Sequence, residues 1–166
     1  PYNYILKKRI DIYATERVQE ALKREFQYIF ADVKYHGLPQ INLHTIAQQP
    51  FQIGNTKVIP IEVMHYKLPI LGYRIGDFTY ITDANFIAEE EQKKIKGSKI
   101  LILNALRPEP HPTHFTLQQA LDMVDVLDVP QVYFTHFSHQ IGLHDELEAI
   151  LPKGIHLAYD GLQFSV

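Results

Sequence analysis

The sequence predicts an α/β protein with a mixed β-sheet. Residues 41–83 form short runs of alternating apolar and polar side chains separated by tight turns, which is typical of a meander of strands. From residue 84 onward, helical patterns alternate with short apolar runs. We therefore expect an α/β sandwich with a mixed sheet rather than a doubly wound parallel one.

The N-terminal part predicts a strand followed by a helix. Residues 11–14 are apolar enough for a short strand, and Thr15 is expected to cap a helix that runs from Glu16 to about Phe30. The apolar residues of that helix fall on one face. Residues 41–46 alternate in the manner of a half-buried strand.

Two hairpins and an alternating region complete the pattern. Residues 51–53 and 56–59 flank Gly54-Asn55, and residues 71–75 and 78–82 flank Gly76-Asp77, so each pair predicts a hairpin. Further along, we expect helices over 88–95, from Thr116 onward and over 145–150, strands over 99–103 and 131–135, and a closing hairpin of 155–159 with 162–166.

Composition limits the classes of function. The chain has 16 lysines and arginines against 19 aspartates and glutamates, a net charge of −3, which argues against nucleic-acid binding. No apolar run approaches the roughly 18–20 residues of a membrane-spanning helix. There are no cysteines, so thiolate metal sites are excluded and a reducing cytoplasm is the expected location.

Three strands each end in a side chain that can bind a metal ion. His65 follows residues 61–64, Asp83 follows residues 78–82, and His136 follows residues 131–135. Side chains at strand ends are held by the sheet yet remain accessible, and two imidazoles with a carboxylate suit Zn²⁺, Mn²⁺ or Fe²⁺. Each residue taken alone also fits a structural role, such as a hydrogen-bonded histidine or a helix-capping aspartate.

A resemblance to a known family covers the chain from about His65 to its C-terminus. The segments VMHYKLPILGYRI (63–75), FTYITD (78–83), RPEPHPTHFT (107–116) and THFSH (135–139) resemble metallo-β-lactamase-fold hydrolases, above all the phosphoribosyl cyclic phosphate phosphodiesterases. The resemblance implies part of an αββα sandwich with a mixed sheet. It also implies a metal-dependent hydrolase that acts on a small, cyclic phosphodiester with two divalent ions, zinc or manganese.

The resemblance also implies a role for each site residue. His65 would bind one metal ion, Asp83 would bridge both ions and take part in catalysis, and His136 would bind the second ion. His114 would be the general acid or would contact the phosphate, because an imidazole can protonate a leaving alkoxide near neutral pH. His139 is an alternative to His136, which we prefer because it directly follows its strand.

One departure from the family pattern concerns the motif HxHxDH, which supplies further ligands and does not occur in the sequence. We expect residues 1–166 to be a single domain that forms the C-terminal portion of a longer one, inactive alone and binding metal partially or not at all. Unpaired strand edges would then favour a homodimer. The alternatives are a nuclease of the same superfamily and a non-catalytic domain with remnant histidines.

Overall fold

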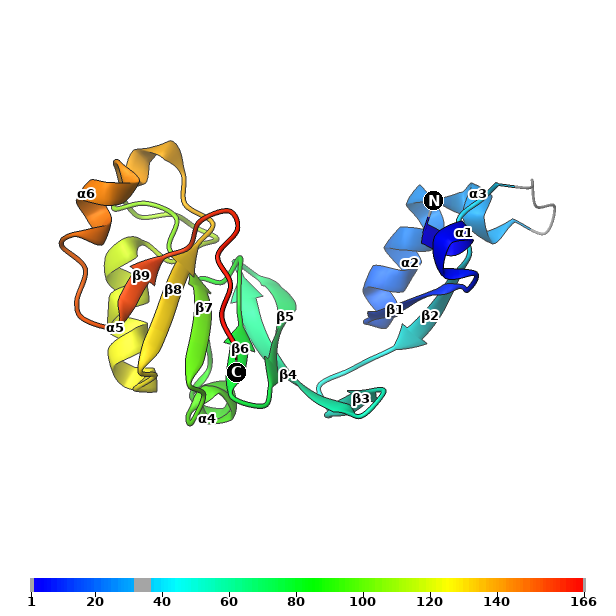
Figure 1. The fold of residues 1–166 in the computed structure, drawn as a ribbon, viewed down its shortest axis with the longest axis horizontal. Coiled ribbons are helices and arrows are strands. Elements are labelled where there is room, and N and C mark those ends of the chain that lie inside the picture. The colour runs from blue at the N-terminus through cyan, green and yellow to red at the C-terminus, as the bar shows by residue number, and fades with distance from the viewer. Residues whose placement is uncertain (1, 32–36, 166) are drawn as a thin grey trace. The chain divides into compact units, whose positions relative to one another are not determined.

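The computed structural model describes residues 2–31 and 37–165, and it divides the chain into two compact units, Pro1–Gln49 and Pro50–Val166 (Figure 1). The site residues predicted from the sequence all belong to the second unit. That residues 1–166 form one domain within a longer one stays a prediction.

The first unit pairs two parallel strands with short helices. It contains α1 (Tyr2–Leu6), β1 (Ile10–Ala14), α2 (Glu16–Glu25), α3 (Gln27–Phe30) and β2 (Ile41–Thr45). The buried Gln19 side chain joins them, because its amide donates to Ala14 O and Thr45 Oγ1, each at 3.1 Å.

The predicted helix over residues 16–30 is wrong in two details. Phe26 adopts φ −118° and ψ 45°, outside the helical region, so the segment breaks into α2 and α3. Thr15 is the residue before α2, but its side chain makes no capping hydrogen bond.

The second unit is built on a seven-stranded mixed sheet whose spatial order follows the sequence. Strands β3 to β6 are antiparallel to their neighbours, whereas β6 to β9 run parallel, which confirms the predicted mixed α/β sheet. The strands are β3 (Phe51–Ile53), β4 (Thr56–His65), β5 (Leu68–Ile75), β6 (Phe78–Tyr80), β7 (Ile100–Asn104), β8 (Gln131–Thr135) and β9 (Ile155–Leu157).

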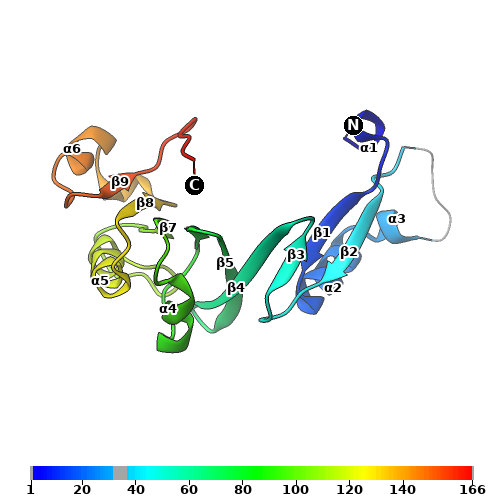
Figure 2. The same ribbon diagram turned by 60° about the horizontal axis from the view of Figure 1, so that its bottom comes forward.

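Helices pack against this sheet, and the hydrophobic core lies between them and the strands. They are α4 (Glu89–Ile95), α5 (Leu117–Leu127), the 3₁₀ helix η1 (His139–Ile141) and α6 (His144–Glu148). Alternate residues of β7 and β8, such as Leu101 and Phe134, are fully buried in one cluster with Ala120 and Leu127 of α5. Figure 2 shows α5 beside β8. Residue spacing in α5 follows the helical period, which is why its apolar face meets the sheet.

The predicted closing hairpin is wrong. Among the described residues, β9 pairs with β8 alone, in parallel, and residues 162–165 form no strand, while Val166 lies outside the described part of the chain. Phe164 instead packs its ring on Phe78 and Tyr133, with ring centroids 5.6 and 5.5 Å away. Apolar alternation after a Gly-containing turn therefore reflects ring packing on the sheet rather than strand pairing.

The topology brings four strand ends to one edge. β5 reverses the chain between β4 and β6, so β4 runs in the same direction as β6, β7 and β8. The segments that leave these strands at their carboxyl ends therefore emerge together. Among the described residues, no helix is long and apolar enough to cross a membrane.

Candidate metal and catalytic site

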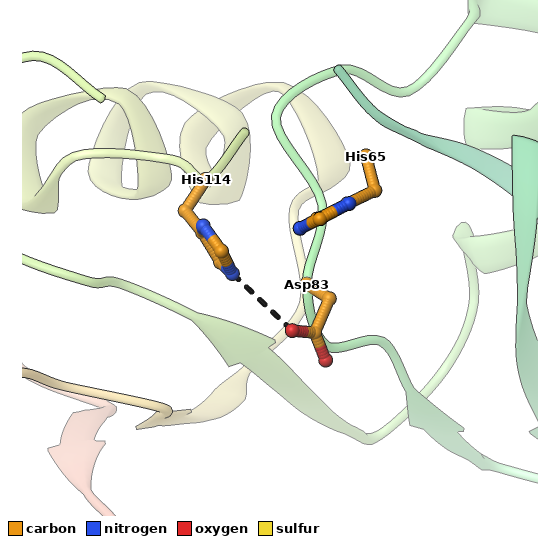
Figure 3. Close-up of side chains that lie close together, drawn as sticks. All are labelled: His65, Asp83 and His114. Atoms are coloured by element: carbon orange, nitrogen blue, oxygen red, sulfur yellow. Dashed lines mark hydrogen bonds and ion pairs between the residues drawn. The ribbon is translucent and has the colours of Figure 1, made fainter. Parts of the chain in front are cut away.

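Four side chains that are distant in sequence meet at this edge. One ligand atom from each of His65, Asp83 and His114 lies within 4.8 Å of the other two, and Figure 3 shows the three side chains pointing toward one another. Asp83 Oδ1 lies 3.2 Å from His114 Nε2 and 3.3 Å from His136 Nε2. Asp83 therefore lies beside His114 and His136, and His65 lies beside Asp83 and His114. That His65, Asp83 and His136 together bind metal stays a prediction.

His65 is the last residue of β4, and the chain turns sharply just after it. Tyr66 has φ 59°, a left-handed conformation that is uncommon for a residue with a side chain. Its backbone N–H donates to Asn85 Oδ1 at 2.9 Å, and Asn85 N donates to Met64 O at 2.8 Å. These two bonds join the end of β4 to the segment that follows Asp83. They therefore hold the backbones of His65 and Asp83 close to each other.

A buried asparagine holds the backbone beside Asp83. Asn104, the last residue of β7, is completely buried; its Oδ1 accepts from Ala84 N at 2.8 Å and its Nδ2 donates to Ala84 O at 2.9 Å. Asp83 itself has φ 60°. The two-point contact with Ala84 therefore keeps Asp83 in a conformation that costs free energy on its own.

His136 leaves β8 in the same way. It follows Thr135 and has φ 62°. Ala105 N, in the loop after β7, donates to Thr135 O at 3.0 Å, which connects this end of β8 to that loop. Its ring stacks on that of His114, with centroids 4.8 Å apart and planes 13° from parallel. The alternative residue, His139, lies in η1 and is exposed. His136 is the one of the two that the fold brings to Asp83; its role as a ligand stays a prediction.

His114 is the buried member of the site, on a loop anchored at both ends. Phe115 N donates to Ala84 O at 2.8 Å, and Leu106 N donates to Phe115 O at 3.0 Å. Burial lowers the pKa of the His114 imidazole, and the nearby rings of His136 and His65 lower it further, against an opposing effect of the Asp83 carboxylate. The lowered pKa disfavours the charged ring at rest, and it makes the protonated ring a stronger acid when it forms.

The Asp83 carboxyl is ionised. Partial burial acts to raise its pKa, but the Thr82 hydroxyl, which donates to Oδ2 at 2.9 Å, and the imidazoles of His114 and His136 together outweigh burial and lower the pKa below its ordinary value. A carboxylate among imidazoles is a donor set for a divalent cation with nitrogen and oxygen ligands. These residues therefore fit a divalent metal ion. A two-metal centre takes more ligands than these four side chains supply.

Sequence reasoning placed His114 beside the ligands but missed its partners. Asn104 is the last residue of the buried strand β7, so it lies at a strand end, as His65 and Asp83 do. A polar residue directly after the apolar run Ile100–Leu103 was the sequence signal that could have identified it. His111 and Thr113 also contact His114, at 3.2 Å between the two Nδ1 atoms and 2.6 Å from Thr113 Oγ1 to His114 Nδ1. Their arrangement depends on the fold of the loop, so spacing alone gave no signal for it.

Known proteins resemble the chain over nearly its whole length. A Porphyromonas gingivalis protein named octanoyltransferase is 37% identical over 158 residues, which is 94% of this chain and 32% of that protein, so the chain spans about a third of this relative. The crystal structure of a diphosphatase of the PhnP family is 37% identical with a TM-score of 0.85, over 96% of this chain and 60% of that one.

More distant structures share the fold. The metallo-β-lactamase-fold protein YhfI of Bacillus subtilis has a TM-score of 0.69 at 15% identity, over 92% of this chain and 63% of that one. Zinc-bound PqqB of Methylobacterium extorquens has a TM-score of 0.72 at 14% identity, over 96% of this chain and 66% of that one. The family model described as the β-lactamase superfamily domain matches residues 4–137. With its mixed sheet and its histidines and aspartate at the strand ends, the chain belongs to the β-lactamase superfamily domain family.

Proposed function

We propose that the protein is a metal-dependent hydrolase of small phosphodiesters, in which His65, Asp83 and His136 hold divalent cations and His114 acts as the general acid. The observation that carries the proposal is the meeting of three imidazoles on one ionised carboxylate at the carboxyl edge of the sheet. The 37% identity to a structure named as a diphosphatase supports phosphorus chemistry as the substrate class.

Each residue has a distinct task in this proposal. A divalent cation at Asp83 would supply Lewis acidity toward a phosphoryl oxygen and make a water more acidic. The two carboxylate oxygens of Asp83 would both be available as metal ligands. His114 presents Nε2 to the site, at 3.2 Å from Asp83 Oδ1. In its protonated form it would donate the Nε2 proton to the departing alkoxide oxygen and become the neutral imidazole.

Metal binding by the chain is the first test. In calorimetric titration of the 166-residue chain with Zn²⁺, we expect Asp83→Asn and His65→Ala to weaken binding at least tenfold. Asp77→Asn is the matched control, because Asp77 precedes β6 at its opposite end and pairs with Lys99 instead. Equal affinities for wild type, Asp83→Asn and Asp77→Asn would contradict the metal site.

Substrate class is the second test. The natural protein, loaded with Zn²⁺ or Mn²⁺, is assayed on a cyclic ribose phosphodiester, on a diphosphate ester and on single-stranded RNA. We expect hydrolysis of the cyclic phosphodiester, and its loss on Asp83→Asn. Cleavage of the diphosphate ester alone would instead match the activity that the similar structure is named for, and cleavage of RNA alone would support the nuclease alternative.

Two alternative functions have less support than phosphodiester hydrolysis. If the domain is non-catalytic, the intact natural protein would retain no metal after purification and would gain no thermal stability from Zn²⁺ or Mn²⁺. Acyl transfer, the activity that the P. gingivalis relative is named for, has no support in the site, which combines imidazoles with a carboxylate in a chain without cysteine. Self-association into a homodimer stays a prediction that light scattering of the purified chain would test.

A further inference from the structure

The strongest unexplained feature is a polar cluster on the far side of His114 from Asp83. His114 Nδ1 lies 2.6 Å from Thr113 Oγ1 and 3.2 Å from His111 Nδ1. Thr113 also contacts His111 Nδ1, through its Oγ1 at 3.1 Å and its backbone N–H at 3.4 Å. His111, Thr113 and His114 therefore form a closed hydrogen-bonded triangle from a single tetrapeptide.

The triangle engages the ring nitrogen of His114 that faces away from the site. If the ring turned over by 180°, a carbon would replace Nδ1 next to Thr113 Oγ1, and the bonds to Thr113 and His111 would be lost. A hydrogen bond lost in this partly buried setting leaves a polar atom without its partner, which disfavours the flipped ring. The triangle thus favours the one ring orientation that directs Nε2 to Asp83 Oδ1 at 3.2 Å.

The loop itself does not depend on the triangle. Arg107 donates to Pro110 O at 3.0 Å and to Gln140 Oε1 at 2.9 Å, and Asn85 Nδ2 donates to Pro112 O at 3.0 Å. Backbone bonds at Leu106 and Phe115 close the loop at its base. The loop is therefore held by bonds other than those of the His111 and Thr113 side chains, which contact each other and His114.

We propose that His111 and Thr113 are positioning residues, which hold Nδ1 of His114 so that its Nε2 faces the reacting oxygen. This inference rests on the proposed function for its consequence in catalysis, but the orientation of the ring can be measured without turnover. A misdirected His114 would fail as an acid while metal binding and substrate binding stayed intact. The geometry of the acid, rather than the affinity for substrate, is what the two residues would set.

Nuclear magnetic resonance of the metal-free chain tests the orientation. We expect the ¹⁵N resonance of His114 Nδ1 to shift in Thr113→Val and in His111→Ala, and to return toward the wild-type position in Thr113→Ser and His111→Asn, which restore a polar atom near the lost one. His44→Ala is the control, because His44 lies in the first unit and contacts Asp11 and Tyr13. An unchanged His114 resonance in Thr113→Val and His111→Ala would overturn the proposal.

Leaving-group dependence tests the catalytic consequence in the natural, metal-loaded protein. General acid catalysis contributes about 10²–10⁴-fold when an alkoxide departs. We expect Thr113→Val and His111→Ala to lower kcat about tenfold or more for the cyclic ribose phosphodiester, with KM within about twofold. For bis(4-nitrophenyl) phosphate, whose nitrophenolate leaves without a proton, kcat should change less than about threefold, and Thr113→Ser should restore the alkoxide rate.

The outcomes separate this inference from the proposed function. Equal loss of kcat with both substrates, or no loss with either, would overturn the positioning role while leaving phosphodiester hydrolysis in place. Failure of the wild-type protein to hydrolyse either substrate would instead overturn the proposed function. In that case, the resonance of His114 alone decides whether His111 and Thr113 orient the ring.

Discussion

Backbone strain at two site residues is the main feature at the scale of single residues. Asp83 and His136 both have φ near 60°, at 60° and 62°, although neither is glycine. Such a conformation costs about 1–2 kcal/mol in a residue with a Cβ atom. Such strain persists only where the surrounding contacts hold the backbone in place. Here it occurs at Asp83 and at His136, whose Nε2 lies 3.3 Å from Asp83 Oδ1.

Asn104 is the residue that we expect to stabilise Asp83. Asn104→Ala removes both hydrogen bonds to Ala84 and leaves a buried N–H without its partner, which costs about 1–3 kcal/mol. We expect a lower free energy of unfolding by about that amount in urea titration, together with weaker Zn²⁺ binding. Asn42→Ala is the control, since the amide of this half-buried residue donates to the Asp11 carboxylate near the surface, and it should change the free energy by less than about 0.5 kcal/mol. An Asn104→Ala variant as stable as Asn42→Ala would contradict this role.

Glu148 carries a stabilising contact that depends on pH. Its carboxylate accepts from Leu157 N at 2.6 Å and contacts His156 Nδ1 at 2.8 Å. Partial burial acts to raise its pKa, but the contacts with Leu157 and His156 outweigh burial and lower the pKa below the ordinary value of 4.5. Stability from this group is thus fully present above pH 4.5 and is lost as the pH falls through the lower folded-state value.

Glu148→Gln should therefore lower stability by about 1 kcal/mol at pH 7, where it removes a charge-assisted bond to a backbone N–H. As the pH falls below 4.5, the difference in Tm between wild type and Glu148→Gln should shrink, because the wild-type carboxyl becomes protonated. Thermal unfolding followed by circular dichroism from pH 7 to pH 3 measures this. A difference in Tm that grows on acidification would show that the carboxylate is not stabilising.

At the scale of secondary structure, the strands could be predicted because their signal is local. The two hairpins, the buried strand β7 and helix α5 each follow from periodicity and turn residues within about ten residues of sequence. The packing of Phe164 on Tyr133 joins residues that are distant in sequence, so the local pattern predicted an extra hairpin instead. The break at Phe26 is a change in the backbone angles of that residue, which residue periodicity does not encode. For the site, residues at strand ends could be found, whereas the His111–Thr113–His114 triangle required the folded loop.

Gly72 shows how closely β5 and β6 approach. A Cβ atom at this position would lie 2.6 Å from Ile81 Cγ1 and 2.9 Å from Tyr80 O, and the backbone oxygen cannot move away without displacing the chain that leads to Asp83. We expect Gly72→Ala to lower the free energy of unfolding by about 1–3 kcal/mol or more, as overpacking does. Gly54→Ala is the comparison: it meets no atom within 4 Å, so only its φ of 58° penalises it. A Gly72→Ala variant as stable as the wild type, measured in urea, would contradict the close contact.

At the scale of the whole molecule, the site belongs to one of the two compact units. His65, Asp83, His114 and His136 all lie within residues 50–166, and the hydrogen bonds that position them come from the same unit. The residues of the first unit hold together through their own contacts, such as those of Gln19 with Ala14 and Thr45. Ligand binding should therefore stabilise the two units to different degrees.

Zinc should protect the second unit alone against local unfolding. A ligand that binds only the native state adds RT ln(1 + [L]/Kd) to its stability, about 2.7 kcal/mol at a hundredfold excess over Kd. In hydrogen exchange of the full chain, we expect Zn²⁺ to slow amide exchange in β4, β7 and β8 and to leave β1 and β2 unchanged. Asp83→Asn should abolish the effect, because it removes the carboxylate that the imidazoles share. Protection of β1 and β2 equal to that of β7 would mean that the metal ion stabilises both units together, and protection that survives in Asp83→Asn would place the ion elsewhere.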